Sequence, residues 1–245
     1  TRLMTRLGDD EVGRTIVAEL EAYGVDMSLS RRHAGCTSPV SAVLVDAAGE
    51  RIIVNHVDPA LPEAPGELPA IPADVRVALG DTRWAAGSAA MLARAKAAGL
   101  TAVLDGDLPG CPVDLLRSAT LVAFSAGGLA RTTGLDDLEA GLSRAATMTD
   151  AIVMATDGAR GVFWLEGETL RHCPAFAVEA VDTLGAGDVF HGALAVALAE
   201  GAGLDAATRF ASAAAAVKVT RFGGRAGAPV RSEVETLLAR GPAHR

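Results

Sequence analysis

The chain has 245 residues, of which 50% are hydrophobic, and it carries a formal net charge of −8 with a pI of about 5.1. This length and composition predict one substantial core and a single domain over residues 1–245. The acidic balance and the small size of every Lys/Arg cluster argue against a nucleic-acid-binding surface, and no apolar stretch resembles a membrane span or a signal peptide. Three scattered cysteines (Cys36, Cys111 and Cys173) and five scattered histidines indicate a cytoplasmic protein without a metal site built from protein ligands.

Periodic apolar patterns predict an α/β fold. Helical spacing occurs over residues 10–23, 85–98, 135–148, 188–200, 204–220 and 232–240. Short apolar and β-branched runs lie between these segments, at residues 75–79, 101–105, 121–124 and 151–156. Strands that alternate with helices of this length favour a mostly parallel sheet, and ligands collect at the carboxyl edge of such a sheet.

Two pairs of strands interrupt the alternation. Residues 40–45 and 51–57 are predicted to form a hairpin around Ala47-Ala48-Gly49-Glu50, with the glycine in the turn. No predicted helix covers this hairpin, so residues 39–57 could project from the sheet as a lid. A second hairpin, residues 161–165 with 169–173, follows the last parallel strand.

Polar residues follow two of the predicted strands. Arg83 comes after strand 75–79, where its guanidinium would suit a tetrahedral oxyanion; a surface arginine stacked on Trp84 would have the same spacing. Asp105 and Asp107 end the next strand, where they could hold Mg²⁺ through water or form a solvated turn.

The segment Thr156-Asp157-Gly158-Ala159-Arg160-Gly161 follows another buried strand. Its glycines allow a tight turn, and the Thr156 hydroxyl could contact a phosphate. A plain turn explains the same residues.

The most informative segment is Asp182-Thr183-Leu184-Gly185-Ala186-Gly187-Asp188, which leads into the apolar run 189–198. It places a turn of small residues, and then a carboxylate, at the positive end of a buried helix. Backbone N–H groups of such a turn can converge on an anion. A carboxylate beside them can accept a proton from a hydroxyl, so the segment favours phosphoryl transfer. The alternative is a helix N-terminus that is capped by Asp182 or Thr183 itself.

This heptad resembles the signature Asp-Thr-x-Gly-Ala-Gly-Asp of the ribokinase-type carbohydrate kinases. The resemblance implies a ribokinase-like three-layer fold with a mostly parallel central sheet and a small β lid. It also implies transfer of the ATP γ-phosphoryl group to a sugar hydroxyl, ATP and Mg²⁺ as cofactors, and a homodimer formed through the lid. By this resemblance Asp188 is the catalytic base and contacts the sugar, and the backbone amides of Gly185, Ala186 and Gly187 form the anion hole.

The resemblance further implies a nucleotide site built from segments on both sides of the heptad. Its expected residues are Thr156, Gly158, Gly161, Thr183, Gly187, Lys218, Gly223 and Gly224. Lys218 could equally be a solvated residue at the end of a helix.

Within the family, the sequence resembles the sulfofructose kinase branch over nearly its whole length. The matching segments are 41–55, 81–84, 103–107, 124–134, 181–199 and 209–229. The branch phosphorylates the 1-hydroxyl of 6-deoxy-6-sulfofructose, and the resemblance implies that Asn55 and Arg83 bind the sulfonate. Two alternatives remain: another ketose or sugar-phosphate kinase (of the fructose or tagatose-phosphate type), or a non-catalytic sugar- or nucleotide-binding homologue.

The sequence departs from the family pattern at two places. Many members carry Asn-x-x-Glu where this chain has Ser125-Ala126-Gly127-Gly128, which argues against direct metal contact from this loop. The family also opens with a strand that carries a sugar-binding Asp and with a Gly-Gly motif, and Thr1 follows both. We therefore expect residues 1–245 to lack half of the sugar site and to be inactive alone.

Overall fold

The structure, a computed structural model, describes residues 1–45, 51–107 and 109–240. Contacts between residues divide the chain into two compact units, Thr1–Pro69 and Ala70–Arg245, and each unit is described by itself. The predicted turn at Ala47-Ala48-Gly49-Glu50 lies outside the described residues.

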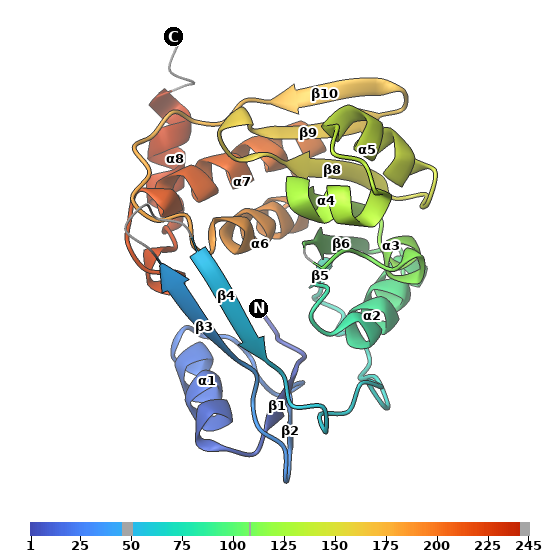
Figure 1. The fold of residues 1–245 in the computed structure, drawn as a ribbon, viewed down its shortest axis with the longest axis vertical. Helices are drawn as coiled ribbons and strands as arrows, with labels where there is room; N and C mark the ends of the chain where they lie inside the picture. The colour runs from blue at the N-terminus through green and yellow to red at the C-terminus, as the bar shows by residue number, and fades with distance from the viewer. Residues whose placement is uncertain (46–50, 108, 241–245) are drawn as a thin grey trace. The chain divides into compact units, whose positions relative to one another are not determined.

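The larger unit is built on a six-stranded sheet within the described residues, in the order β10-β9-β8-β7-β6-β5 (Figure 1). β5 to β8 are parallel, whereas β9 and β10 form the antiparallel hairpin predicted beside them. The strands are β5 (Val77–Gly80), β6 (Thr101–Gly106), β7 (Leu121–Ser125), β8 (Ile152–Thr156), β9 (Val162–Glu166) and β10 (Thr169–Cys173). The carboxyl ends of the parallel strands therefore share one edge of the sheet.

Helices cover both faces of this sheet (Figure 1). One layer contains α2 (Ala85–Ala97), α3 (Val113–Ser118), α4 (Ala126–Thr133) and α5 (Leu138–Ala146). The other contains α6 (Ala186–Ala199) and α7 (Leu204–Val219), and α8 (Arg231–Arg240) packs against α7. This arrangement confirms the predicted three-layer α/β fold. Among the described residues, no helix combines the length and the apolar character needed to cross a membrane.

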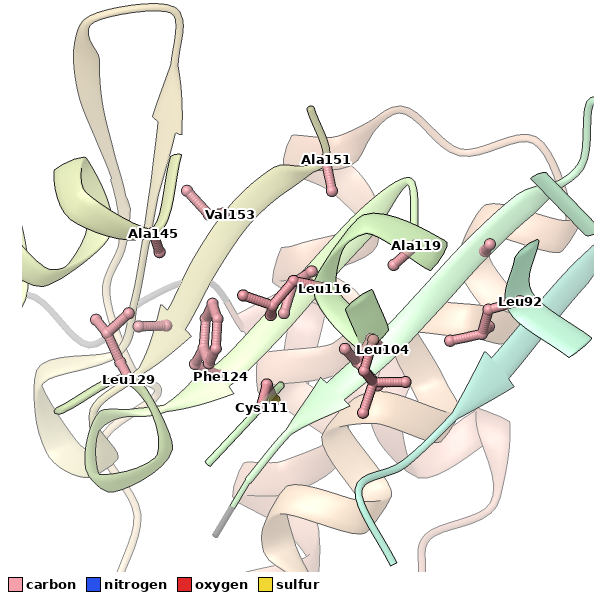
Figure 2. Close-up of a cluster of buried hydrophobic side chains, with 14 of the residues drawn as sticks. Leu92, Leu104, Cys111, Leu116, Ala119, Phe124, Leu129, Ala145, Ala151 and Val153 are labelled. Atoms are coloured by element: carbon pink, nitrogen blue, oxygen red, sulfur yellow. The ribbon is translucent and has the colours of Figure 1, made fainter. Parts of the chain in front are cut away.

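The two helical layers pack on alternate residues of the same strands. Leu104 and Phe124 join the α2–α5 core, whereas their neighbours Val103 and Ala123 join the α6–α7 core, because successive side chains of a strand point to opposite faces. Figure 2 shows Leu104 and Phe124 among the leucines of the first core. Each fully buried side chain of this size stabilises the fold by roughly 1.5–3 kcal/mol, and both are 0% exposed.

The helices α3 and α4 were not predicted from the sequence. α3 is short, and Gly127 and Gly128 lower the helical propensity at the start of α4. Gly128 is required there, because a Cβ would lie 2.0 Å from the backbone oxygen of Gly106. Residues 125–128, predicted as a loop, are therefore the N-cap and the start of a helix that packs against the end of β6.

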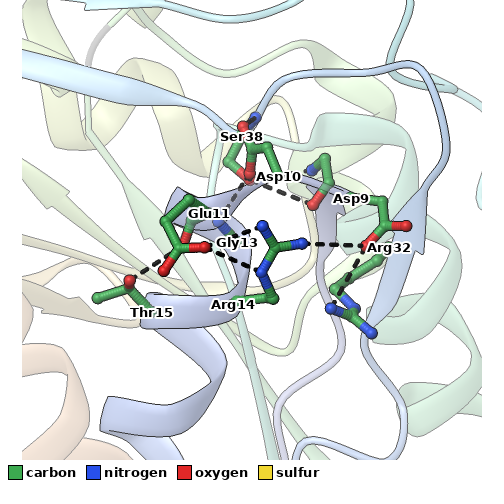
Figure 3. A network of polar contacts seen from close by, with 9 residues as sticks. Asp9, Asp10, Glu11, Gly13, Arg14, Thr15, Arg32 and Ser38 are labelled. Carbon is green, nitrogen blue, oxygen red and sulfur yellow. Dashed lines mark hydrogen bonds and ion pairs between the residues drawn. The ribbon is translucent and has the colours of Figure 1, made fainter.

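The smaller unit contains a parallel pair of strands, β1 (Arg6–Gly8) and β2 (Arg31–His33), with α1 (Glu11–Ala22) between them in sequence. Asp10 caps α1: its Oδ1 accepts hydrogen bonds from Gly13 N–H at 2.7 Å and from the Ser38 hydroxyl at 2.7 Å (Figure 3). Its Oδ2 accepts from Ser38 N–H at 2.8 Å. One carboxylate thus joins the start of α1 to the segment that leads into the predicted lid.

The predicted lid hairpin consists of β3 (Val40–Val45) and β4 (Arg51–His56). One face carries Leu44, Ile52 and Val54, whose exposed fractions are 57%, 68% and 58%. The other face carries Asn55, whose side-chain oxygen accepts a 2.6 Å hydrogen bond from Ser41. Val43 and Ile53 on the Asn55 face are also exposed (37% and 51%), so within this unit the hairpin leaves apolar side chains uncovered on both faces.

Candidate active site

The start of α6 is open. Its N-cap is Gly185, which has the left-handed backbone conformation (φ 78°) and provides no side-chain cap. Asp188 lies in the first turn, as predicted, and is exposed. A Cβ on Gly187 would meet no atom within 4 Å, so the space beside this backbone is free. Asp182 does not cap the helix, because its carboxylate accepts from Leu184 N–H and Gly223 N–H; a cap from Thr183 stays an alternative, and the open space at Gly187 suits an anion.

Not every amide of the turn is equally available. Ala186 N–H donates to the Thr183 carbonyl oxygen at 3.2 Å. The first helical hydrogen bond runs from Val189 N–H to Gly185 O, so the N–H groups of Gly187 and Asp188 have no partner within the helix. These two amides are better placed than Ala186 to bind an anion.

Asp182 holds the turn before α6 against a second loop. Its carboxylate accepts hydrogen bonds from Leu184 N–H at 2.8 Å and from Gly223 N–H at 3.0 Å. These bonds, that of Leu184 first, hold the pKa of Asp182 below its ordinary value. A Cβ on Gly185 would lie 3.6 Å from Gly224 Cα, so the two glycine-containing loops lie side by side.

Lys218 is buried and belongs to the same network. Its side chain is 0% exposed, and its Nζ donates to the backbone oxygen of Asp182 at 2.8 Å and lies 3.5 Å from the Asp182 carboxylate. The alternative of a solvated lysine at a helix end is therefore wrong. The ammonium is bound to Asp182, so in this structure it fixes the loops beside the open helix end, and its contact with a nucleotide stays a prediction.

The two carboxylates at the end of β6 point to different partners. Asp105 Oδ2 lies 3.3 Å from Nδ1 of His191, whereas Asp107 Oδ1 accepts a 2.7 Å hydrogen bond from the Ser125 hydroxyl. Ser125 also caps α4. Among the described residues, no group of three or more His, Cys, Asp or Glu side chains is placed to hold a metal ion.

Asp105 is the most perturbed carboxyl group of this edge. Burial raises its pKa to about 6, His191 opposes that rise, and the carboxylates of Asp107, Asp188 and Asp81 add to it. These residues come from the ends of β5 and β6 and from the first turn of α6, so the structure gathers them around one point.

His191 was not singled out from the sequence. It lies on α6 one turn after the motif and is only 4% exposed. A polar residue in the apolar run 189–198 was the available signal, because a buried polar side chain needs partners.

The other predicted residues lie at four separate places in the fold. Arg83 is exposed after β5, and its backbone N–H donates to the Asp81 carboxylate at 2.9 Å. Asn55 lies on β4 of the smaller unit. The Thr156 hydroxyl, at the end of β8, donates to the Phe124 carbonyl at 3.3 Å. Gly161 has φ 93°, and a Cβ there would lie 2.2 Å from the Cys173 carbonyl oxygen.

The glycine at position 161 is therefore required by packing alone. Gly158, with φ 48°, has open space around its Cα, so its place in the turn needs only a left-handed backbone. The roles of both glycines toward a nucleotide stay predictions.

A family model described as "pfkB family carbohydrate kinase" matches residues 1–231. The match covers most of the chain. The chain belongs to the pfkB family of carbohydrate kinases.

Individual relatives agree with this family. A ribokinase from Bacillus subtilis is 47% identical over 98 residues, which are 40% of this chain and 33% of that protein. A fructokinase from Klebsiella pneumoniae is 32% identical over 213 residues, covering 79% of this chain and 69% of the relative. The structure of Arabidopsis thaliana ribokinase with ribose and ATP superimposes with a TM-score of 0.82 at 25% identity, covering 97% of this chain and 81% of that one.

The fold is therefore ribokinase-like. The matches to three ribokinases, from Bacillus subtilis, Lactococcus lactis and Haemophilus influenzae, span only about a third of those proteins (33%, 29% and 28%).

Proposed function

We propose that the protein is an ATP-dependent sugar kinase that transfers the γ-phosphoryl group to a hydroxyl of a ketose. The observation that carries this proposal is the N-terminus of α6, where the N-cap Gly185 has no side chain and Asp188 is exposed in the first turn. An anion site and a proton acceptor within one turn of helix are what phosphoryl transfer to a hydroxyl requires.

In the proposed reaction, the sugar hydroxyl loses its proton to the Asp188 carboxylate as its oxygen bonds to the γ-phosphorus. The bond between that phosphorus and the oxygen of the leaving ADP breaks in the same step. The N–H groups of Gly187 and Asp188, with those of Gly185 and Ala186 as further candidates, stabilise the charge on the phosphoryl oxygens. The described residues would therefore position the two substrates, accept the proton and stabilise the phosphoryl charge with backbone N–H groups.

ATP supplies the phosphoryl group, and the described residues fit it at the open helix end. Mg²⁺ is proposed as the counter-ion of the nucleotide, because Mg²⁺ usually keeps several waters and substrate phosphates as ligands. The nucleotide is proposed to lie along Thr156, Gly158, Gly161, Thr183, Gly187, Gly223 and Gly224. Lys218 is proposed to hold the loop before α6 against the loop that contains Gly223 and Gly224.

The proposed substrate is 6-deoxy-6-sulfofructose, phosphorylated on its 1-hydroxyl. Arg83 supports this choice, because it is exposed just beyond the carboxyl end of β5 and its fork suits a sulfonate. Asn55 is proposed as the second sulfonate contact. The fructokinase similarity makes fructose the main alternative, with a sugar phosphate such as tagatose phosphate as a further one.

The test is ATP consumption by the full-length protein with sulfofructose, fructose, fructose 6-phosphate and ribose. A strong preference for sulfofructose would support the proposed substrate, and turnover of another sugar would keep Asp188 but remove the sulfonate role of Arg83. Silence on all four with ATP bound would favour a non-catalytic binding protein.

The variant Arg83→Ala sharpens this test. Loss confined to the sulfonated sugar is expected, because only that substrate presents an oxyanion to the guanidinium. Arg94→Ala, an exposed arginine near the other end of α2, is the matched control. An unchanged substrate ranking in Arg83→Ala would rule out the sulfonate role.

We also propose that the two units act as one kinase domain and that β3 and β4 are its lid and dimer contact. Asn55 would face the sugar, which leaves the opposite face, with Leu44 and Ile52, for a second copy of the chain. Leu44→Lys should convert a dimer to a monomer in light scattering, whereas Ile53→Lys, on the Asn55 face, should not. A wild-type monomer at micromolar concentration would refute the contact.

A further inference from the structure

His191 places both of its ring nitrogens against oxygens that can only accept hydrogen bonds. Nδ1 lies 2.7 Å from the Gly187 carbonyl oxygen, and Nε2 lies 2.9 Å from the Ala123 carbonyl oxygen. A neutral imidazole carries a single N–H, so it can satisfy only one of these carbonyls. Both bonds form only if the ring is protonated on both nitrogens.

The surroundings supply the counter-charge for such a ring. Asp105 Oδ2 lies 3.3 Å from Nδ1, and the Asp105 side chain is only 17% exposed. Three further carboxylates act on Asp105: Asp81 from the end of β5, Asp107 from the end of β6 and Asp188 from α6. A cation among these groups is favoured, since burial strengthens the interaction between opposite charges.

The carbonyl that His191 contacts belongs to the proposed anion site. Gly187 O and Asp188 N–H are the two ends of one peptide group. In the α-helix this oxygen already accepts the backbone N–H of His191, so one residue binds it through both its main chain and its side chain. A cation bound to the oxygen draws electron density toward it and makes the N–H at the other end a stronger donor.

We propose that His191 is a positioning residue for phosphoryl transfer: held as a buried cation between Gly187 O, Ala123 O and Asp105, it fixes and polarises the Gly187–Asp188 peptide of the anion site. The role rests on the proposed function, because it acts through the amide that meets the phosphoryl group. It ties the first turn of α6 to β6 and β7, so the catalytic carboxylate and the anion site are held by the sheet itself.

The first experiment is steady-state kinetics on the full-length protein with His191→Gln, using ATP and the sugar that the wild type turns over best. The amide side chain keeps one donor but has no charge. We expect kcat to fall at least about tenfold, with the KM values for ATP and sugar within about twofold, because a polarised donor acts mainly on the transition state.

Leu194→Ala is the matched control. Leu194 lies one turn further along α6 and is 0% exposed, so its truncation should lower the melting temperature at least as much as His191→Gln does. A control with unchanged kcat shows that loss of packing in α6 does not by itself slow the reaction. If both variants lose kcat in proportion to their melting temperatures, His191 has only a structural role.

The second experiment reads the charge directly in the wild type. Long-range ¹H–¹⁵N spectra at pH 7.5 should show one histidine with both ring nitrogens protonated, and this signal should be missing from His191→Gln. Asp105→Asn should return His191 to a neutral tautomer and lower kcat less than His191→Gln does. A neutral His191 in the wild type would overturn the proposal.

The outcomes separate this role from the function on which it rests. A wild type that turns over sugar, with a His191→Gln variant of equal kcat, would refute the role of His191 alone. A wild type with no kinase turnover would refute the proposed function, and the role of His191 in phosphoryl transfer would fall with it.

Discussion

Two helix N-termini in this protein are built in opposite ways. At the start of α1, the Asp10 carboxylate occupies the helix end and accepts from Gly13 N–H (Figure 3). At the start of α6, Gly185 offers no side chain, and the nearest acidic groups serve other purposes: Asp182 binds the loop at Gly223, and Asp188 is exposed. One helix dipole is thus neutralised by its own sequence, and the other is left for a ligand.

The difference also shows in what holds each helix end in place. The start of α1 is held by its N-cap residue, Asp10, which binds the free amide of Gly13. The start of α6 is instead held by buried side chains: Lys218 donates to the backbone oxygen of Asp182, and the His191 ring contacts Gly187 O. Buried ion pairs add little net stability, but they can specify one geometry, and a helix end that must stay open needs such support.

The largest effect is expected at the open end. Asp188→Asn should lower kcat by a factor of about 10² or more, because the amide cannot accept the hydroxyl proton. Its stability should change little, since Asp188 is exposed. The measurement is ATP consumption with the preferred sugar.

Asp205→Asn is the control for this change, because Asp205 is also an exposed carboxylate in the first turn of a helix, α7. A wild-type kcat in Asp188→Asn would remove the base from its proposed role. An equal loss in Asp205→Asn would point to a general electrostatic effect.

The variant Lys218→Met tests the contact between Lys218 and Asp182, which holds the loop before α6. The change removes the donor to Asp182 and leaves a part-buried carboxylate with fewer partners, so the free energy of unfolding should fall by about 1–3 kcal/mol. The KM for ATP should rise, because the loops at Gly185 and Gly223 lose their link. Urea unfolding followed by tryptophan fluorescence measures the first effect, since Trp84 and Trp164 both lie in the larger unit.

Lys96→Met is the control, since Lys96 donates to the exposed Arg117 carbonyl at the surface. It should cost about 1 kcal/mol or less and leave the KM for ATP unchanged. Equal effects of the two substitutions would show that burial of Lys218 has no special function.

The sequence predicted the open end well but not its support. The order Gly-Ala-Gly-Asp before an apolar run is local, so the turn and the first-turn carboxylate could be recognised. The bond from Lys218 to Asp182 spans 36 residues, and that from His191 to Ala123 spans 68. Such pairs depend on how layers pack, which periodicity does not encode.

The same reason explains the errors in the fold. The strands of the larger unit were found because apolar runs mark them, whereas α4 was missed because its glycines oppose a helix. Gly128 is present because α4 approaches the Gly106 backbone too closely for a Cβ at that position. The departure from Asn-x-x-Glu at 125–128 thus coincides with a tight contact between β6 and α4.

Gly187→Ala should separate stability from catalysis at the open end. A Cβ there meets no atom within 4 Å, so the helix should gain about 0.5–1 kcal/mol. The rate should nevertheless fall roughly tenfold, because the methyl group reduces the close approach of a phosphoryl oxygen to the amides. Gly192→Ala, also without neighbours and further along α6, should give the gain in stability with no loss of rate.

The smallest effect is expected at the start of α1, which the Asp10 carboxylate caps. Hydrogen bonds from the Ser38 hydroxyl, Ser38 N–H and Gly13 N–H lower the pKa of Asp10 from 3.8 to about 2. Because the folded pKa lies below the unfolded one, the ionised carboxylate stabilises the fold above about pH 4, and this contribution is lost as the pH falls through 2. Asp10→Asn should therefore be less stable than the wild type at pH 7, and the difference should shrink between pH 4 and pH 2.

Ser38→Ala tests the cause, since the hydroxyl makes the largest contribution to the lowered pKa. Hydrogen exchange in the peptide from α1, measured by mass spectrometry at each pH, reports on this helix without the larger unit. In the wild type, α1 should lose protection as the pH falls from 4 to 2, and Ser38→Ala should lose less over the same range. A pH-independent difference between wild type and Asp10→Asn would mean that Asp10 acts through shape alone. The comparison between α1, capped by the charged Asp10, and α6, whose N-terminus is left for an anion, would then rest on α6 only.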